Sequence, residues 1–125
     1  MCGIGGLISL DSTNVIPLAK TMMKSMNKRA PDGTALFIDN KLYQYKSPEN
    51  ILCNSPNTTL ALGHNRLAIV GDKQHIQPFQ SCDGKLIMEH NGEIYNYKML
   101  KEKLKKEHHF VSNTDSEIVV HLLEH

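Results

Sequence analysis

Residues 1–10 read MCGIGGLISL, and the fold is set by this stretch. Positions 4, 6, 8 and 10 carry Ile, Gly, Ile and Leu in alternation, which is the period-two pattern of a β-strand. The strand is therefore expected to begin almost at the first residue. Cys2 lies just before it, so the sequence places a thiol at the N-terminal edge of a strand.

The segments that follow predict a helix and a hairpin. Residues 16–26 carry apolar side chains at a three-to-four spacing, with Pro17 in the first turn, which indicates an amphipathic helix. The helix is expected to end at the stretch RAPDG of residues 29–33, because proline disfavours helical geometry in the residue before it. Asp39-Asn40 then separates two short apolar runs, as in a β-hairpin.

Further strands and two closing helices follow. Short strands are expected at 60–62 and 67–70, and Asp-Gly at 83–84 predicts a second hairpin. One helix is expected over residues 97–106, and a second from residues 114–117, where Thr followed three residues later by Glu fits a capping box. Strands grouped with helices, without strict alternation, favour an α+β domain.

Composition limits the class of protein. The chain has 125 residues, enough for one domain, with 40% hydrophobic and 22% charged residues. No segment approaches the run of about 20 apolar residues that a membrane span needs. The formal charge of +1 gives no reason to expect nucleic acid or a membrane as a partner. Cys2, Cys53 and Cys82 are an odd number without Cys-x-x-Cys spacing, so neither a disulfide framework nor a zinc site is indicated, and a cytoplasmic location is expected.

Cys2 is the strongest candidate for chemistry. Removal of Met1 would place a thiol and a free α-amine on one residue. The amine has a pKa near 7.7 to 8.0 and the thiol one near 8.5, so at neutral pH the amine can accept the thiol proton. Cys2 would then be a nucleophile that carries its own base. The alternative, an ordinary buried cysteine at the start of a strand, remains open.

Asn91-Gly92 is a candidate oxyanion hole. A side-chain amide and a backbone N–H can together face the oxyanion of a tetrahedral intermediate. Asn-Gly is also a common tight-turn dipeptide, and taken alone the turn is the favoured interpretation.

Arg66 and Asp115 are candidates for binding a zwitterion. The planar guanidinium of Arg66 suits bidentate capture of a carboxylate, and Asp115 could accept a hydrogen bond from an ammonium group. An amino-acid substrate presents both charges. Each residue also has a structural alternative, a surface ion pair for Arg66 and a favourable place near a helix N-terminus for Asp115.

Together these stretches resemble the class II glutamine amidotransferases, and in particular the glutaminase domain of glutamine-hydrolysing asparagine synthetases. The resemblance covers essentially the whole chain. It rests on the order of five motifs: MCGI at 1–4, RAPDG at 29–33, GHNRLAI at 63–69, NGEIYNY at 91–97 and TDSE at 114–117.

The resemblance implies an N-terminal-nucleophile hydrolase fold, a four-layer αββα sandwich of antiparallel sheets, in which Cys2 hydrolyses the side-chain amide of glutamine to glutamate and ammonia. It also implies roles for individual residues. Asn91 and Gly92 would hold the oxyanion. The substrate would be bound by Arg66, Leu67, Ile69, Val70, Asn91, Gly92, Glu93 and Asp115, with Arg66 on the α-carboxylate and Asp115 and Glu93 on the α-ammonium group.

One motif departs from the family pattern. Ala30 stands where the family usually carries glycine, and alanine would be strained there by about 1 kcal/mol or more if the backbone had a positive φ.

Further expectations concern what lies outside the chain. Family glutaminase domains are longer, so residues 1–125 are expected to be the N-terminal portion of one, incomplete at the C-terminus. The ammonia would pass to an ATP-dependent synthetase domain, fused or separate. ATP and magnesium are expected only in that domain, no cofactor or metal is expected in this chain, and a homodimer is left open. The alternative function is a catalytically silent module that binds glutamine or a partner and retains Met1.

Overall fold

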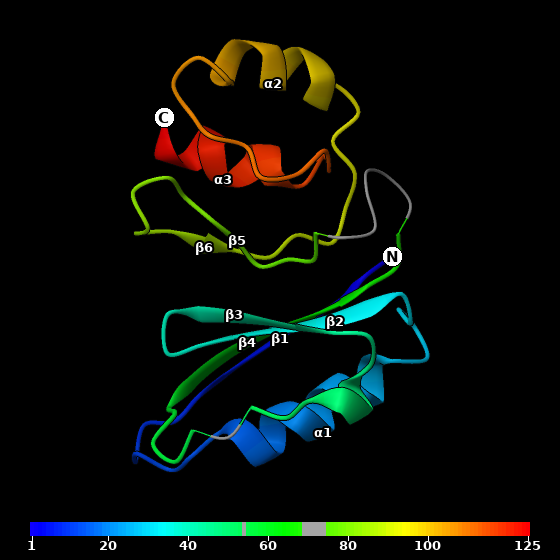
Figure 1. The fold of residues 1–125 in the computed structure, drawn as a ribbon, viewed down its shortest axis with the longest axis vertical. Helices are drawn as coiled ribbons and strands as arrows, with labels where there is room; N and C mark the ends of the chain where they lie inside the picture. The colour runs from blue at the N-terminus through cyan, green and yellow to red at the C-terminus, as the bar shows by residue number, and fades with distance from the viewer. Residues whose placement is uncertain (54, 69–74) are drawn as a thin grey trace.

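The computed structural model describes residues 1–53, 55–68 and 75–125 and arranges them in layers (Figure 1). In chain order the elements are β1 (Gly3–Ile8), α1 (Ile16–Met26), β2 (Gly33–Ile38), β3 (Lys41–Tyr45), a 3-10 turn η1 (Pro48–Asn50), β4 (Leu60–Arg66), β5 (Phe79–Gln80), β6 (Ile87–Met88), α2 (Tyr97–Leu104) and α3 (Glu117–Glu124).

Two antiparallel sheets stand between helices. β1, β4, β2 and β3 form one sheet in that order, and β5 pairs with β6 in a separate ribbon. α1 lies on one side of the four-stranded sheet, and the ribbon, α3 and α2 lie on the other side (Figure 1). The predicted α+β class with antiparallel sheets is confirmed.

α1 packs closely on the sheet because glycine faces it. Met23 of α1 is fully buried, and a Cβ built on Gly63 of β4 would lie 2.4 Å from its sulfur. On β1, a Cβ on Gly5 would lie 2.7 Å from the sulfur of Met22. Both distances are well inside van der Waals contact, so these glycines set the spacing between helix and sheet.

β2 is covered on both faces. All six of its residues are buried, although successive side chains of a strand point to opposite sides. Leu36 and Ile38 belong to the core with α1, while a Cβ on Gly33 would lie 2.4 Å from Cδ1 of the buried Ile76. The segment that enters β5 therefore closes the face of the sheet opposite α1.

Several local predictions are confirmed. β1 and α1 occupy the expected segments, although Leu10 lies beyond the end of β1. The hairpin between β2 and β3 turns at Asp39 and Asn40, whose φ angles of 49° and 58° fit a two-residue turn with both central residues left-handed. Gly84, with a φ of 73°, lies in the predicted second hairpin, between β5 and β6.

The prediction of two strands at 60–62 and 67–70 was wrong in part. β4 runs without interruption to Arg66, because it pairs with β1 on one side and β2 on the other through its polar residues. The buried amide of Asn65 is satisfied within the core: its Oδ1 accepts from Oγ1 of Thr34 at 3.0 Å, and its Nδ2 donates to the carbonyl of Met23 at 2.9 Å. Residues 67–68 form no strand, and 69–70 lie outside the described residues.

The predicted capping box was also wrong. α3 begins at Glu117 with Ser116 as its N-cap, and no side chain caps it. The Glu117 carboxylate instead accepts hydrogen bonds from the backbone N–H groups of Val111 (2.6 Å) and Ser112 (2.8 Å) and from Oγ of Ser112 (2.6 Å). Because both carboxylate oxygens bind the segment that precedes the helix, the Glu117 side chain forms no capping hydrogen bond in the first turn.

Ala30 carries no left-handed strain. Among the described residues the non-glycine positions with positive φ are Ser12, Asp39 and Asn40, and Ala30 is fully buried. Alanine at position 30 therefore carries none of the penalty expected for a left-handed residue.

Among the described residues, the three helices are all too short to span a bilayer as apolar helices.

Candidate active site

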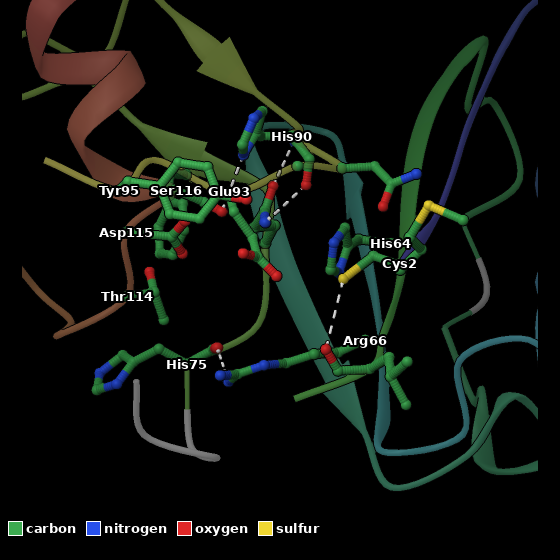
Figure 2. Close-up of a pocket in the computed structure, with 16 residues that line it drawn as sticks. Cys2, His64, Arg66, His75, His90, Glu93, Tyr95, Thr114, Asp115 and Ser116 are labelled. Carbon is green, nitrogen blue, oxygen red and sulfur yellow. Dashed lines mark hydrogen bonds between the residues drawn. The ribbon is translucent and has the colours of Figure 1, made fainter. Parts of the chain in front are cut away.

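Cys2 lines a cavity at the end of the four-stranded sheet (Figure 2). It is half-buried, its thiol is free, and its S–H group points to the carbonyl of Leu67, with 3.8 Å between sulfur and oxygen. Nε of Arg29 donates to the Cys2 carbonyl at 3.3 Å. Met1 is 65% exposed and borders the same cavity. The N-terminus is thus held in place by its second residue, while the first remains accessible.

Arg66, the last residue of β4, provides a buried cation. Its side chain is held by the carbonyl of His75, which accepts from Nη1 at 2.6 Å (Figure 2). The end of the strand is fixed by Asp32, whose N–H donates to the Arg66 carbonyl at 2.9 Å and whose Oδ2 accepts from the Ala68 N–H at 2.8 Å. The RAPDG stretch therefore positions the arginine.

His64 lines the cavity two residues before Arg66. Burial, together with the nearby Arg66 charge, lowers the pKa of His64 to about 4. Its imidazole is thus neutral at pH 7. Neither ring nitrogen has a hydrogen-bond partner among the described residues, although the side chain is 1% exposed.

The loop that carries Asn91 and Gly92 is braced at His90. The His90 N–H donates to Oε1 of Gln77 at 2.5 Å, and Nε2 of Gln77 donates to the His90 carbonyl at 3.0 Å. The imidazole lies 3.1 Å from Oγ of Ser116 through Nδ1. A Cβ on Gly92 would lie 2.6 Å from Nε2 of that ring, so a side chain at this position would displace the His90 imidazole.

Asp115 provides a nearly buried carboxylate across the cavity from Arg66 (Figure 2). Its Oδ2 accepts from the Ile94 N–H at 2.7 Å, which ties the segment two residues before α3 to the loop after Gly92. No hydrogen bond from a described residue engages the other oxygen of this carboxylate. Glu93 adds a second acidic side chain on the same side (Figure 2).

The cavity has a volume of about 300 Å³, the lower end of the range for small-molecule pockets. It brings together the predicted residues that the structure describes: Cys2, Arg66, Leu67, Asn91, Gly92, Glu93 and Asp115. Predicted Ile69 and Val70 lie outside the described residues. A thiol, a cation and two carboxylates thus share one small space, an arrangement suited to a zwitterion with a reactive side chain.

Sequence reasoning missed other lining residues, among them His64, His75, Gln77, His90 and Tyr95. His64 could have been found, because it lies on the strand face of Arg66 at period-two spacing. His90 directly precedes the Asn-Gly pair. Gln77 had no signal, since its role depends on a contact with His90 across 13 positions of the chain.

Comparison with known proteins places the chain in a family. The sequence profile of the glutamine amidotransferase domain matches residues 48–125. A Methanocaldococcus jannaschii protein that carries the name of a glutamine-hydrolysing asparagine synthetase is 36% identical over 99% of this chain and 23% of its own length. A Schizosaccharomyces pombe protein with the same kind of name is 36% identical over 98% of this chain and 19% of its own length. The glutamine–fructose-6-phosphate aminotransferase of Listeria monocytogenes is 33% identical over 99% of this chain and 22% of its own length.

The chain therefore spans about a fifth of the length of these relatives. Their names share glutamine and otherwise describe two kinds of enzyme, asparagine synthetases and an aminotransferase. On the profile match and on these identities, the chain belongs to the glutamine amidotransferase domain family.

Proposed function

We propose that this chain hydrolyses the side-chain amide of glutamine with Cys2 as its N-terminal nucleophile. The observation that carries the proposal is the single cavity in which the Cys2 thiol lies with Arg66 and Asp115. An amino-acid zwitterion needs one fixed cation and one fixed anion, and a glutaminase also needs a nucleophile at the far end of the side chain.

Met1 must be removed for the reaction. Its 65% exposure makes it accessible to an aminopeptidase, and its loss frees the α-amine of Cys2. The amine takes the thiol proton as sulfur attacks the amide carbon, and passes it to the departing ammonia. Water then attacks the thioester, which releases glutamate and restores the thiol.

The oxyanion of each tetrahedral intermediate would be held by the Asn91 side chain and the Gly92 N–H. The brace at His90 supports this role, because donors that are already in place stabilise a transition state without reorganisation. Arg66 would bind the α-carboxylate, helped by the backbone of Leu67, Ile69 and Val70. Asp115 and Glu93 would bind the α-ammonium group.

The proposal extends to the layer arrangement of the fold and to the destination of the ammonia. The order α1, four-stranded sheet, ribbon, α3 and α2 supports the αββα layer arrangement of N-terminal-nucleophile hydrolases (Figure 1). The ammonia would pass to an asparagine-synthetase-like domain that uses ATP and magnesium, in a cytoplasmic protein. The two relatives named for asparagine synthetase support that acceptor.

Intact-mass measurement and ammonia release test the proposal together. We expect chains that lack Met1, and glutamine-dependent ammonia release that falls to background in Cys2→Ala. Ammonia release equal in wild type and Cys2→Ala would overturn it. Complete retention of Met1 would favour the alternative, a silent module that binds glutamine or a partner.

A further inference from the structure

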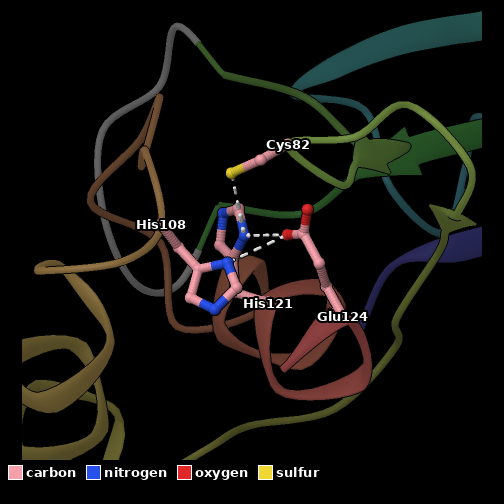
Figure 3. A group of neighbouring side chains, drawn as sticks. All are labelled: Cys82, His108, His121 and Glu124. Atoms are coloured by element: carbon pink, nitrogen blue, oxygen red, sulfur yellow. Dashed lines mark hydrogen bonds and ion pairs between the residues drawn. The ribbon is translucent and has the colours of Figure 1, made fainter.

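A second cluster of reactive side chains lies outside the cavity: Cys82, His108, His121 and Glu124 (Figure 3). Cys82 is in the turn between β5 and β6, His108 follows α2, and His121 and Glu124 lie one turn apart on α3. Figure 3 shows the four side chains directed toward one another. One ligand atom from each lies within 4.8 Å of the others.

The separations are close to those of a four-coordinate ion. Nδ1 of His121 lies 3.8 Å from Sγ of Cys82 and 3.1 Å from Oε2 of Glu124, and Nδ1 of His108 lies 3.1 Å from the same oxygen. Tetrahedral zinc, with its usual bond lengths, separates sulfur from nitrogen by about 3.5 Å and nitrogen from oxygen by about 3.4 Å. Since all four ligand atoms lie within 4.8 Å of one another, shifts of roughly 1 Å would bring them to the separations of a tetrahedral zinc site.

Hydrogen bonds leave one contact of this cluster unmet. Nδ1 of an imidazole carries either one proton or one lone pair in the ring plane, yet Nδ1 of His121 faces both a thiol and a carboxylate. Oε2 of Glu124 can accept from both imidazoles, so the unmet contact is the one between the Cys82 thiol and His121. A cation at the centre would engage all four groups.

The surroundings hold the ligands as an outer shell would. Nε2 of His121 has no hydrogen-bond partner among the described residues, and Oε1 of Glu117 lies 3.6 Å away, just beyond hydrogen-bond distance. The Glu117 carboxylate is 2% exposed and is fixed by the loop before α3, so a small shift of the ring would complete this contact. A carboxylate behind a ligating histidine is a common outer-shell partner of metal sites. The His109 N–H donates to Sγ of Cys82 at 3.3 Å, and the Asp83 N–H donates to Oε1 of Glu124 at 2.9 Å.

We propose that Cys82, His108, His121 and Glu124 bind one Zn²⁺-like divalent transition-metal ion. A thiolate, two imidazoles and a carboxylate are the donor types that zinc takes in proteins, and four protein ligands leave no open position, as in a structural site. The ion joins the turn between β5 and β6, the segment after α2 and helix α3. Since Asp115 lies just before α3, the ion also steadies one wall of the cavity.

Residue spacing does not indicate this site, because its ligands come from three separate segments. Zinc motifs are usually read from short, regular spacings of Cys and His. Here only His121 and Glu124 are near each other in the chain.

Cobalt binding is the direct test. The full chain is freed of metal with a chelator and titrated with Co²⁺ alone, with absorbance followed in the near ultraviolet and the visible. We expect a thiolate-to-cobalt charge-transfer band and the intense visible bands of tetrahedral cobalt, both saturating at one equivalent. Zn²⁺ should abolish them, since it binds such donors more tightly than cobalt.

Cys82→Ser and Cys2→Ser are matched thiol variants. Cys82 is exposed, so its replacement should leave the circular dichroism spectrum unchanged. We expect Cys82→Ser to lose the charge-transfer band and at least about 100-fold in affinity, the upper end of what loss of an outer-shell partner costs. Cys2→Ser should keep both, and Zn²⁺ should raise the unfolding temperature of Cys2→Ser but not of Cys82→Ser.

Three results would overturn the site. The first is the absence of cobalt bands at one equivalent in the wild type. The second is a charge-transfer band unchanged by Cys82→Ser, which would locate the ion at another thiol. The third is a set of visible bands without charge transfer, which would locate the ion at the outer group Glu107, His108 and His125, where no thiol is present.

Discussion

Glu89, directly after β6, is a poorly solvated carboxylate whose ionisation opposes folding. Burial raises its pKa to about 8, against which a hydrogen bond with the Gly5 backbone acts only in part. Its Oε1 has no hydrogen-bond partner among the described residues. In the unfolded chain the pKa returns to 4.5. The folded state keeps a proton that the unfolded state loses, so stability falls as pH rises from about 4.5 to about 8.

His64 acts with the opposite sign in a different pH range. Its pKa is about 4 in the fold and 6.5 in the unfolded chain. Below pH 6.5 the His64 imidazole is protonated in the unfolded state but stays neutral in the folded state, so the free energy of unfolding falls as pH drops toward 4. The two effects oppose each other between pH 4.5 and 6.5. Between pH 6.5 and 8 the Glu89 effect is the larger of the two, because the His64 imidazole of the unfolded chain then loses its proton as well.

Glu89→Gln removes this effect and allows its size to be measured. One pKa unit corresponds to about 1.36 kcal/mol, so the rise of about 1.5 pH units from pH 6.5 to pH 8 corresponds to a loss of stability of about 2 kcal/mol before solvent screening is considered. Solvent screening at this incompletely buried site reduces it, and we expect about 1 to 2 kcal/mol. The free energy of unfolding is measured by urea denaturation for wild type and Glu89→Gln at pH 6.5 and pH 8. Between these pH values the wild type should lose this amount of stability relative to Glu89→Gln.

Glu102→Gln is the control, because the Glu102 side chain on α2 is 68% exposed. Its stability relative to wild type should be the same at both pH values. If the difference between wild type and Glu89→Gln were also the same at both, the burial argument for Glu89 would be refuted.

Three further substitutions test packing and the cavity. Gly63→Ala should lower the free energy of unfolding by about 1 to 3 kcal/mol in urea denaturation, because its Cβ meets Met23, and an unchanged midpoint would contradict the close packing of α1. Gly92→Ala should keep the fold but lower kcat for glutamine by about 100-fold, because it displaces the His90 ring; wild-type kcat would argue against a braced oxyanion hole. Arg66→Lys should raise KM for glutamine by about 10-fold or more through loss of a bidentate contact, whereas an unchanged KM would remove Arg66 from carboxylate binding.

Local chemistry made part of the fold predictable. The turn at Asp39-Asn40 depends on two residues that tolerate positive φ, and the pattern of α1 depends only on its own side chains. β4 could not be predicted whole, because its buried polar residues find partners far away in the chain, as Asn65 does in Met23. The capping box predicted at the start of α3 was wrong for the same reason, since Glu117 binds the backbone of Val111 rather than the first turn.

The cavity was predictable as a set of residues and not as a geometry. Motif order pointed to Cys2, Arg66 and Asp115, each of which lines the cavity. The bonds that hold their supports, such as Gln77 to His90, join segments whose sequence carries no mark of the contact. The metal cluster shows the same limit, because Cys82 and His121 meet only after folding.

Covalent trapping would identify the nucleophile, with an analogue of glutamine whose side-chain amide is replaced by an electrophile. The chain offers a clear contrast: Cys2 in the cavity, Cys53 buried and Cys82 exposed. We predict one adduct per chain, located on Cys2 by peptide mass spectrometry, confined to chains that lack Met1 and suppressed by excess glutamine. An adduct on the exposed Cys82 with Cys2 unmodified would contradict the account.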